Sequence, residues 1–552
     1  MLKRRILLTI AFLYSLNFIN SAQIDYMCVK LKGDFTKSYK IDDVRKVIFP
    51  TKKEMGIVPY IGEVVIYSLD DLVRVLFTDA SEENILYVDE DMIIDENSSY
   101  DAVVIAENGN SDIYLDIENT TLTAGSVLMY VNEVGVAPKI NVRGSGALST
   151  NKFVVSRLIK SDIWTMISLP YDVQISDITV NGSPAIVGEN IIFREYDGER
   201  RALQSKEGMT VSGWKSKNGG VLPANIGFAV AINSDYGEVQ EVTFPSSNIV
   251  IDASSVALPL IRHYSTVNKG VDADWNFIGN PTLSLQEKEM GYSVYVYNSE
   301  KDSYDEYSSQ QSVQYSPFSS FFVQSQDGFT NILFSQSVAR SFKSANLNSG
   351  VVELRINDDD KLTLLLNEDS DNEYVRNEDA LYMSPNNSEL SQIYMIRNGV
   401  KMAVSEQPTF DDEVTVGYIA PKGVQTITVT RLPENVGLVL VDKTLDSEDV
   451  MLEGDSYEFN NTTTTNNSRF VLKFTELTGV EVEDANSHQI VVSGDRIYVK
   501  GCNPGEVIYL YSSTGTLLGQ TISQNNIAEL RTLAQGVLVV KIDDKVYKVV
   551  KR

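Results

Sequence analysis

The chain has 552 residues and a formal net charge of −28, with a pI of about 4.5. Its length predicts roughly three to five domains, and its 43% of hydrophobic residues is enough to bury several cores. An acidic surface repels nucleic-acid phosphates and anionic lipids, so nucleic acid is excluded as a partner. The 28 tyrosines and 20 phenylalanines favour β structure.

The first 22 residues have the features of a signal peptide. Lys3, Arg4 and Arg5 form a positive start, residues 6–19 form an apolar run, and Ala22 is a small residue before the expected cut. The run is too short for a stable membrane span, although a retained anchor helix is the alternative. No later segment is long and apolar enough to cross a bilayer, so the sequence predicts export and no transmembrane anchor after signal removal.

Residues 23–80 are expected to form a short N-terminal β segment. Residues 27–49 have the alternation of two strands and a turn, with a short helical turn at residues 41–44. Residues 81–160 hold brief apolar phrases such as "ILYV", "AVVIAENG" and "SVLMYV". Their spacing is near that of stacked coils, which favours an irregular β region or a small β-solenoid. A meander or part of a sandwich is the alternative.

Two larger β-sandwich units are expected in residues 161–340 and 341–476. Strand-like phrases broken by Gly, Asn, Asp or Ser recur in both, and few windows keep a helical period. Trp164, Trp214 and Trp275 lie beside apolar strand residues, so we expect all three in the core.

Two polar stretches are interpreted as connections. Residues 460–467 are expected to form a loop between strands, because the run consists only of Asn and Thr. Residues 475–482 are expected to link the second sandwich to the last domain and to contain a processing site.

Residues 480–552 have the pattern of a third, smaller sandwich. The alternation in "VIYLY" suits a strand, "STG" suits a tight turn, and "AQG" leads into the strand-like "VLVVKI". Asp543 and Asp544 form the expected turn into a last strand that ends in "YKVVKR".

This C-terminal stretch closely resembles the sorting domain of cargo of the type IX secretion system. That family has a G-V-Y-x-V-K-like strand and a last strand that ends in K-x-x-K. Gly536 and Lys541 fill the first pattern and Lys548 and Lys551 the second, while Leu538 stands where an aromatic residue is usual. The match covers about an eighth of the chain. Phrases in the body also resemble the multi-domain β-rich surface proteins of bacteria that use this system.

The resemblance implies an immunoglobulin-like fold for the last domain and a cellular destination for the protein. The type IX machinery would be a partner, and the protein would pass through the periplasm to the outer cell surface or the medium. The sorting domain would then be cut off, with the body released or joined to lipopolysaccharide. The resemblance implies nothing about the task of the body.

Nucleophilic and zinc chemistry find little support in the sequence. The chain has two histidines, and a catalytic triad or dyad needs a histidine that a third group holds. His488 lies in the domain that would be removed, and His263 has no visible partner, so a hydrogen-bonded strand position is expected for it. Cys28 and Cys502 are expected to be small buried residues. H-E-x-x-H and C-x-x-C motifs are absent.

Two hypotheses from different classes remain for the body. Tyr295 and Tyr297 lie two residues apart on one face of an expected strand and could stack on sugar rings, with packing inside the fold as the alternative. The rival hypothesis is a polysaccharide hydrolase that uses two carboxylates, although nothing selects a pair among 75 Asp and Glu residues. We favour a non-enzymatic protein that adheres to, or binds, a glycan or a host protein.

Calcium stays open as a structural ligand. Residues 272–276 ("DADWN") and 369–373 ("DSDNE") offer alternating oxygen atoms, but both lack the Gly and Glu of a calcium loop. Solvated β-turns are the simpler interpretation of both. The sequence as a whole predicts an all-β, multi-domain protein of β-sandwiches, with a short solenoid-like region and a C-terminal immunoglobulin-like sorting domain.

Overall fold

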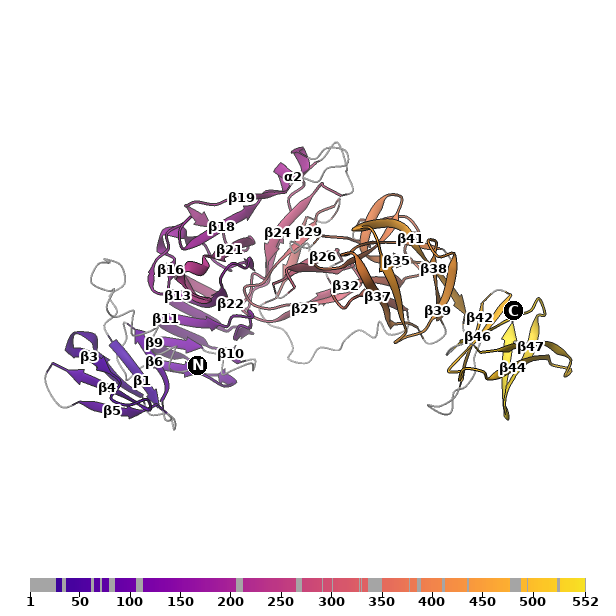
Figure 1. Ribbon diagram of the computed structural model, residues 1–552. Coiled ribbons are helices and arrows are strands. Elements are labelled where there is room, and N and C mark those ends of the chain that lie inside the picture. The colour runs from indigo at the N-terminus through magenta and orange to yellow at the C-terminus, as the bar shows by residue number, and fades with distance from the viewer. Residues whose placement is uncertain are drawn as a thin grey trace. The chain divides into compact units, whose positions relative to one another are not determined.

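The protein is almost entirely β structure in the computed structural model (Figure 1). The described residues contain one α-helix, the short α2 (Gly198–Gln204). The predicted all-β fold is therefore confirmed, whereas the predicted signal peptide lies outside the described residues. The structure describes residues 26–551 except 32–35, 61–63, 70–71, 79–84, 106–112, 205–211, 265–270, 290, 300, 327, 329, 336–349, 377, 385–388, 410–412, 434–435, 477–487, 494 and 524–526.

The chain folds into two compact units. Unit 1 comprises Met1–Lys288 and Ser312–Phe342, and unit 2 comprises Glu289–Gln311 and Lys343–Arg552. The hairpin of β26 (Val294–Asn298) and β27 (Ser303–Tyr307) thus belongs to unit 2, although both segments that flank it in sequence belong to unit 1.

The N-terminal segment of unit 1 supplies two three-stranded sheets, ordered β2-β1-β6 and β3-β4-β5. Residues 27–49 contribute to three strands and not to the two predicted. A 3-10 turn at Ile41–Asp43 lies between β2 and β3, which belong to different sheets. The predicted helical turn is confirmed. The strands are β1 (Tyr26–Leu31), β2 (Thr36–Lys40), β3 (Val44–Ile48), β4 (Glu54–Pro59), β5 (Val65–Ser68) and β6 (Leu72–Thr78).

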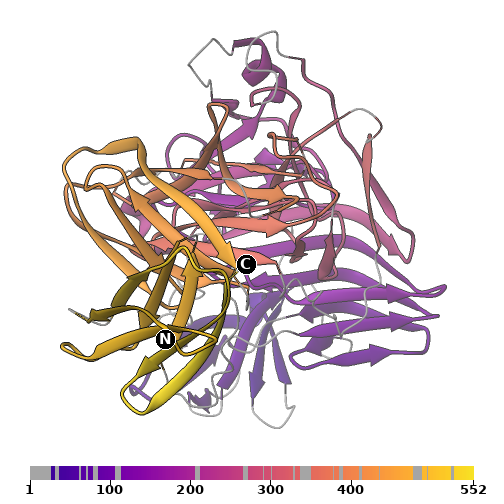
Figure 2. The ribbon, with the colours of Figure 1, turned by 90° about the vertical axis from the view of Figure 1, so that its right-hand side faces the viewer.

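The next strands form a short parallel β-solenoid, seen as stacked arrows in Figures 1 and 2. Leu115 pairs in parallel with Met92, 23 residues earlier, and with Ile140, 25 residues later, so each coil takes about two dozen residues. Because all these pairs are parallel, the meander alternative is wrong. The strands are β7 (Ile85–Val88), β8 (Met92–Ile94), β9 (Ser98–Ile105), β10 (Tyr114–Glu118), β11 (Thr121–Val131), β12 (Lys139–Arg143) and β13 (Ala147–Lys160).

Asparagine side chains hold successive coils together at the turns. Asn97 Oδ1 accepts the backbone N–H of Thr121 at 2.9 Å, and Asn119 Oδ1 accepts that of Ser145 at 3.2 Å. These two turn amides are therefore satisfied by side chains of the coil before them. Asn119 has φ 55°, a backbone conformation that asparagine tolerates well.

Antiparallel strands complete unit 1. The long strand β22 (Val239–Asp252) pairs with β13 and extends the solenoid sheet, and smaller sheets pack beyond it. Trp275 is fully buried, whereas Trp164 and Trp214 are only half-buried. The smaller sheets include the strands β18 (Ile191–Tyr196), β21 (Phe228–Ile232), β23 (Val256–Pro259), β24 (Trp275–Gly279) and β29 (Ser320–Gln324).

Unit 2 contains one large, mostly antiparallel sheet of eleven strands around a single apolar core. The expected loop at residues 460–467 is shorter than predicted, because β40 runs to Asn461 and β41 begins at Thr465. The strands are β31 (Val351–Ile356), β32 (Asp360–Leu366), β33 (Ala380–Leu381), β34 (Gln392–Arg397), β35 (Val400–Gln407), β36 (Val414–Ile419), β37 (Gly423–Arg431), β38 (Val436–Asp442), β39 (Ser447–Met451), β40 (Ser456–Asn461) and β41 (Thr465–Glu476).

A small antiparallel sandwich ends the chain. One sheet has the order β42-β43-β46 and the other β45-β44-β47-β48, with apolar side chains between them. Cys502 lies in this core and Cys28 lies in unit 1; both are buried, as expected. The strands are β42 (Gln489–Ser493), β43 (Arg496–Lys500), β44 (Val507–Ser512), β45 (Leu517–Ile522), β46 (Ile527–Arg531), β47 (Gly536–Ile542) and β48 (Lys545–Lys551).

Candidate functional sites

Of the two tyrosines of the predicted sugar platform, one lies inside the fold and the other is half-buried. Tyr295 on β26 is 1% exposed, and its hydroxyl accepts the backbone N–H of Leu381 at 2.8 Å. Tyr297 is half-buried; its hydroxyl donates to Asp302, and its ring meets that of Tyr304 edge-on, with the centroids 5.4 Å apart. Tyr295 therefore cannot offer its ring to a ligand here, and packing is the correct interpretation for this residue.

Two carboxyl groups with raised pKa values lie where this hairpin packs within unit 2. Glu306 on β27 is 7% exposed and accepts the N–H of Met383 at 3.3 Å, while Asp360 accepts the N–H of Ile393 at 2.9 Å. Burial raises the pKa of Asp360 to about 6. Burial and the negative charge of Asp360 together raise the pKa of Glu306 well above its usual range.

This pair is a candidate for the two carboxylates of the hydrolase hypothesis. Raised pKa values suit a general acid, but Glu306 is too deeply buried for a sugar to reach it in this structure. A packing role at the base of the hairpin fits the geometry better. Sequence reasoning missed the pair because acidic residues are common along the whole chain.

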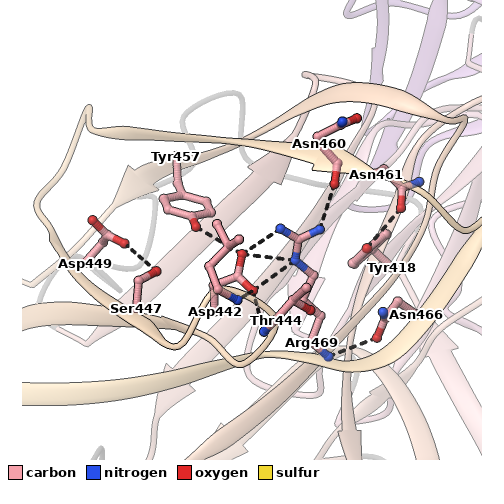
Figure 3. Close-up of polar contacts among 11 residues, drawn as sticks. Tyr418, Asp442, Thr444, Ser447, Asp449, Tyr457, Asn460, Asn461, Asn466 and Arg469 are labelled. Carbon is pink, nitrogen blue, oxygen red and sulfur yellow. Dashed lines mark hydrogen bonds and ion pairs between the residues drawn. The ribbon is translucent and has the colours of Figure 1, made fainter.

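A third polar cluster surrounds a buried ion pair in the large sheet of unit 2 (Figure 3). Arg469 Nη2 lies 2.6 Å from Asp442 Oδ2, and its Nε lies 3.0 Å from Oδ1. Tyr457 donates to the same carboxylate at 3.0 Å, and Arg469 Nη1 donates to the carbonyl of Asn460 at 2.9 Å. Every partner comes from unit 2, so the cluster ties β38, β40 and β41 together.

The acidic run at residues 272–276 is not a solvated turn, contrary to expectation. Asp272 is fully buried and lies 3.2 Å from Arg201 Nε, and Asp274 accepts from Arg262 Nε at 3.0 Å. Both carboxylates therefore already have cationic partners. The second run, residues 369–373, is mostly exposed, as a solvated turn requires.

His263 lies beside this cluster, outside any strand. Its backbone N–H donates to Asp274 Oδ1 at 2.8 Å, and its half-buried ring lies against Gly198 of α2. Burial lowers the pKa of His263, although the charges of Asp197, Asp274 and Glu199 oppose that change. The predicted strand position of His263 is therefore wrong, and its hydrogen bond to Asp274 comes from the backbone N–H.

Large apolar side chains are exposed around this cluster. Leu203 on α2 is 70% exposed and Tyr264 is 72% exposed, and Ile261 is also exposed. The guanidinium of Arg262 lies 5.4 Å from the centre of the Tyr264 ring, and its Nε donates a hydrogen bond to Asp274. The ring of Tyr264 is therefore both exposed and supported, which sequence reasoning could not foresee because exposure depends on the fold.

The four residues of the C-terminal motif come together on the last hairpin. Gly536 pairs directly with Lys551, and Lys548 pairs with Val539 across β47 and β48. Lys541 and Lys548 are exposed on the same outward face, because they occupy diagonal positions of the ladder. Lys551 instead is buried, and its ammonium group donates to the carbonyl of Thr532.

Charge and apolar groups distinguish this outward face. Residues 488–552 hold eight Lys and Arg against five Asp and Glu, a formal charge of +3 in a chain of −28. Tyr509 lies beside Lys541 in the sheet, and Tyr511 lies beside Val539. Val546, the neighbour of Lys541 on the other side, is 63% exposed. We call the residues Tyr509, Tyr511, Val539, Lys541, Val546 and Lys548 the lysine face.

Comparison with known proteins adds little to this description. No protein-family model and no curated protein matches the chain. One solved structure, described as "Biofilm associated protein - BSP domain", is similar at 10% identity with a TM-score of 0.14. The match covers 65% of this chain and 59% of that structure, so the chain spans less than two thirds of it. Such a low TM-score carries no argument.

The class that the fold defines is a multi-domain all-β protein with a parallel solenoid and antiparallel sandwiches. Within the parts of the chain that the structure describes, no helix combines the length and apolarity needed to cross a membrane.

Proposed function

We propose that this protein is exported to the outer cell surface or the medium by the type IX secretion machinery. Its body would bind a glycan or protein ligand there and catalyse no reaction. The observation that carries the export proposal is the lysine face, which gathers Lys541 and Lys548 on an exposed sheet surface of the C-terminal sandwich. A basic, partly apolar strip on an acidic protein is a surface that a receptor can distinguish from the rest of the chain.

The export proposal is tested by charge reversal in a bacterium that carries type IX machinery. Lys541→Glu with Lys548→Glu should leave the protein folded but hold it in the periplasm, as should deletion of residues 480–552. The matched control reverses two exposed lysines of the preceding sandwich, Lys422→Glu with Lys443→Glu. Surface display of the charge-reversed sorting variant at the level of the control would disprove recognition through this face.

For the body, we propose that the ligand binds at the exposed group around Tyr264 and not at the predicted tyrosine pair. Exposed aromatic rings stack on sugar rings and act as anchors in protein interfaces. Arg262 holds the ring of Tyr264 and is itself held by Asp274, so little side-chain freedom is lost on binding.

The binding proposal is tested with glycan and protein arrays on the purified full chain. Tyr264→Ala should reduce the strongest array signal at least about tenfold, the loss of one good aromatic contact. Tyr60→Ala removes another exposed tyrosine, 67% exposed, and should change nothing. Equal signals for the two variants would place the ligand elsewhere, and an array blank for the unmodified protein would remove the proposal for these ligand classes.

A further inference from the structure

We propose that the C-terminal sandwich contains a transition-metal site that binds Zn²⁺ through His488, Cys502 and Glu506. One donor atom of each residue lies within 4.8 Å of the donor atoms of the other two. Bonds of about 2.0–2.3 Å to a tetrahedral zinc ion would place such atoms roughly 3.5 Å apart. Small side-chain rotations therefore suffice to close the three donors around one ion.

The donor set has the chemistry that zinc prefers. Imidazole nitrogen, thiolate sulfur and carboxylate oxygen are the three ligand types of protein zinc sites. Calcium and magnesium prefer oxygen ligands throughout, so a thiol and an imidazole in the set favour zinc over them. His488 and Cys502 are both buried, which would shield the bound ion from solvent.

The surrounding residues already orient the donors. His488 Nδ1 lies 3.1 Å from the hydroxyl of Tyr547, so Nε2 is directed toward Glu506 Oε2 at 3.2 Å. The N–H of Asn503 donates to the same carboxylate at 2.8 Å. A hydrogen bond to the second imidazole nitrogen is the usual outer-shell partner of a metal-bound histidine.

Proton changes accompany the binding step. Without metal, the Cys502 thiol lies 3.4 Å from the carbonyl of Val499, and burial raises its pKa to about 11. Zinc binding would replace the thiol proton, which leaves as H⁺. The imidazole proton would lie on Nδ1, where it can donate to the hydroxyl of Tyr547. Three protein ligands would leave the fourth position of a tetrahedral ion to a water molecule.

The bound ion would join the start of the domain to an internal loop. His488 directly precedes β42, whereas Cys502 and Glu506 lie between β43 and β44. The site thus secures the point at which the chain enters the sandwich. This inference does not depend on the export proposal, since it concerns only the chemistry of these side chains.

Cobalt substitution gives the sharpest test. The full chain, freed of metal with a chelator, should bind one equivalent of Co²⁺ and develop the near-ultraviolet charge-transfer band of a thiolate–cobalt bond. Zn²⁺ should then displace the cobalt and abolish the band. Competition with a chromophoric chelator gives the zinc affinity for the protein and its variants.

Three variants decide the assignment. Cys502→Ala and His488→Gln should each weaken zinc binding at least about 100-fold, and Tyr547→Phe about tenfold, as expected for ligands and for an outer-shell group. Cys28→Ala removes the other thiol and should leave both the band and the affinity unchanged. Urea unfolding of the metal-free variants checks that the sandwich still folds. No thiolate band in the unmodified chain, or a band that survives Cys502→Ala in a folded protein, would overturn the site.

Discussion

Two buried carboxyl groups in unit 2 meet opposite surroundings. Asp442 in the large sheet faces Arg469, whose Nε and Nη2 both donate to its carboxylate. Glu306 on the hairpin has the negative charge of Asp360 as its neighbour and the backbone N–H of Met383 as its hydrogen-bond donor. Burial alone raises the pKa of both groups, but Arg469, Thr444 and Tyr457 hold the pKa of Asp442 below its usual value.

The difference teaches how the fold tolerates a buried acid. Asp442 stays ionised because its partner supplies an opposite charge and its oxygens are fully hydrogen-bonded. Glu306 faces the negative charge of Asp360, so the fold keeps a proton on it more readily instead. The stability that depends on Asp442 is therefore sensitive to the loss of Arg469, and the stability that depends on Glu306 is sensitive to pH.

Removing the cation should have the largest effect. Arg469→Ala leaves Asp442 charged and buried, and we expect unit 2 to lose roughly 3–5 kcal/mol of unfolding free energy. Urea unfolding followed by hydrogen exchange measures this loss in unit 2. All three tryptophans lie in unit 1, so an unchanged tryptophan transition is the internal control. A loss below about 1 kcal/mol would mean that the pair is solvated in solution.

Removing both charges should recover most of that loss. Asp442→Leu combined with Arg469→Met replaces the pair by apolar groups of similar size, and we expect the double variant to lie within about 1 kcal/mol of the unmodified protein. The comparison with each single variant gives the coupling free energy. A double variant as unstable as Arg469→Ala would show that the bonds to Tyr457 and Asn460 matter more than the charge.

The hairpin should become less stable as the pH rises. A folded-state pKa above the unfolded value means that the folded form holds protons the unfolded form has lost, so this stability is present at low pH and disappears as the pH rises through the folded pKa. With Asp360 at about 6, amides of β26 and β27 should exchange faster at pH 7.5 than at pH 5 after correction for intrinsic rates. Equal protection at both pH values would contradict the burial of these acids.

Glu306→Gln should cancel part of this pH effect. The amide oxygen can still accept from Met383, and we expect about 1 kcal/mol of stabilisation at pH 7.5 because no charge has to be buried. Glu353→Gln is the matched control, since Arg355 and Lys361 lower the pKa of Glu353 against the effect of burial. The control should destabilise slightly, and the same sign for both variants would refute the contrast.

The smallest expected effect concerns the edge of the ion-pair cluster. Tyr418 donates to Asn461 Oδ1 at 3.1 Å in a buried position (Figure 3). Tyr418→Phe should cost about 0.5–1.5 kcal/mol, the typical net value of one hydrogen bond. Calorimetry of the unit 2 transition measures it, and a cost equal to that of Arg469→Ala would make Tyr418 part of the core of the cluster.

Local patterns predicted the strands well and their partners poorly. The turn at residues 41–44 and the apolar phrases of the solenoid were correct, because alternation and turn chemistry are local. The polar run at residues 460–467 is predicted to be a loop, yet Asn460 and Asn461 end β40. The backbone carbonyl of Asn460 accepts from Arg469, and the buried side chain of Asn461 accepts from Tyr418. A polar residue gives no local sign of whether water or a buried partner will satisfy it.

The sequence by itself determined the all-β class and the last hairpin with its lysines, and it gave a solenoid as one of the alternatives for residues 81–160. These features repeat every two residues or every coil, so they can be read along the chain. Only the tertiary structure decided that Tyr295 is buried while Tyr264 is exposed, that Asp272 and Asp274 face arginines, and that His488 meets Cys502 and Glu506. Exposure and ion pairing depend on contacts between distant segments, and no local pattern encodes them.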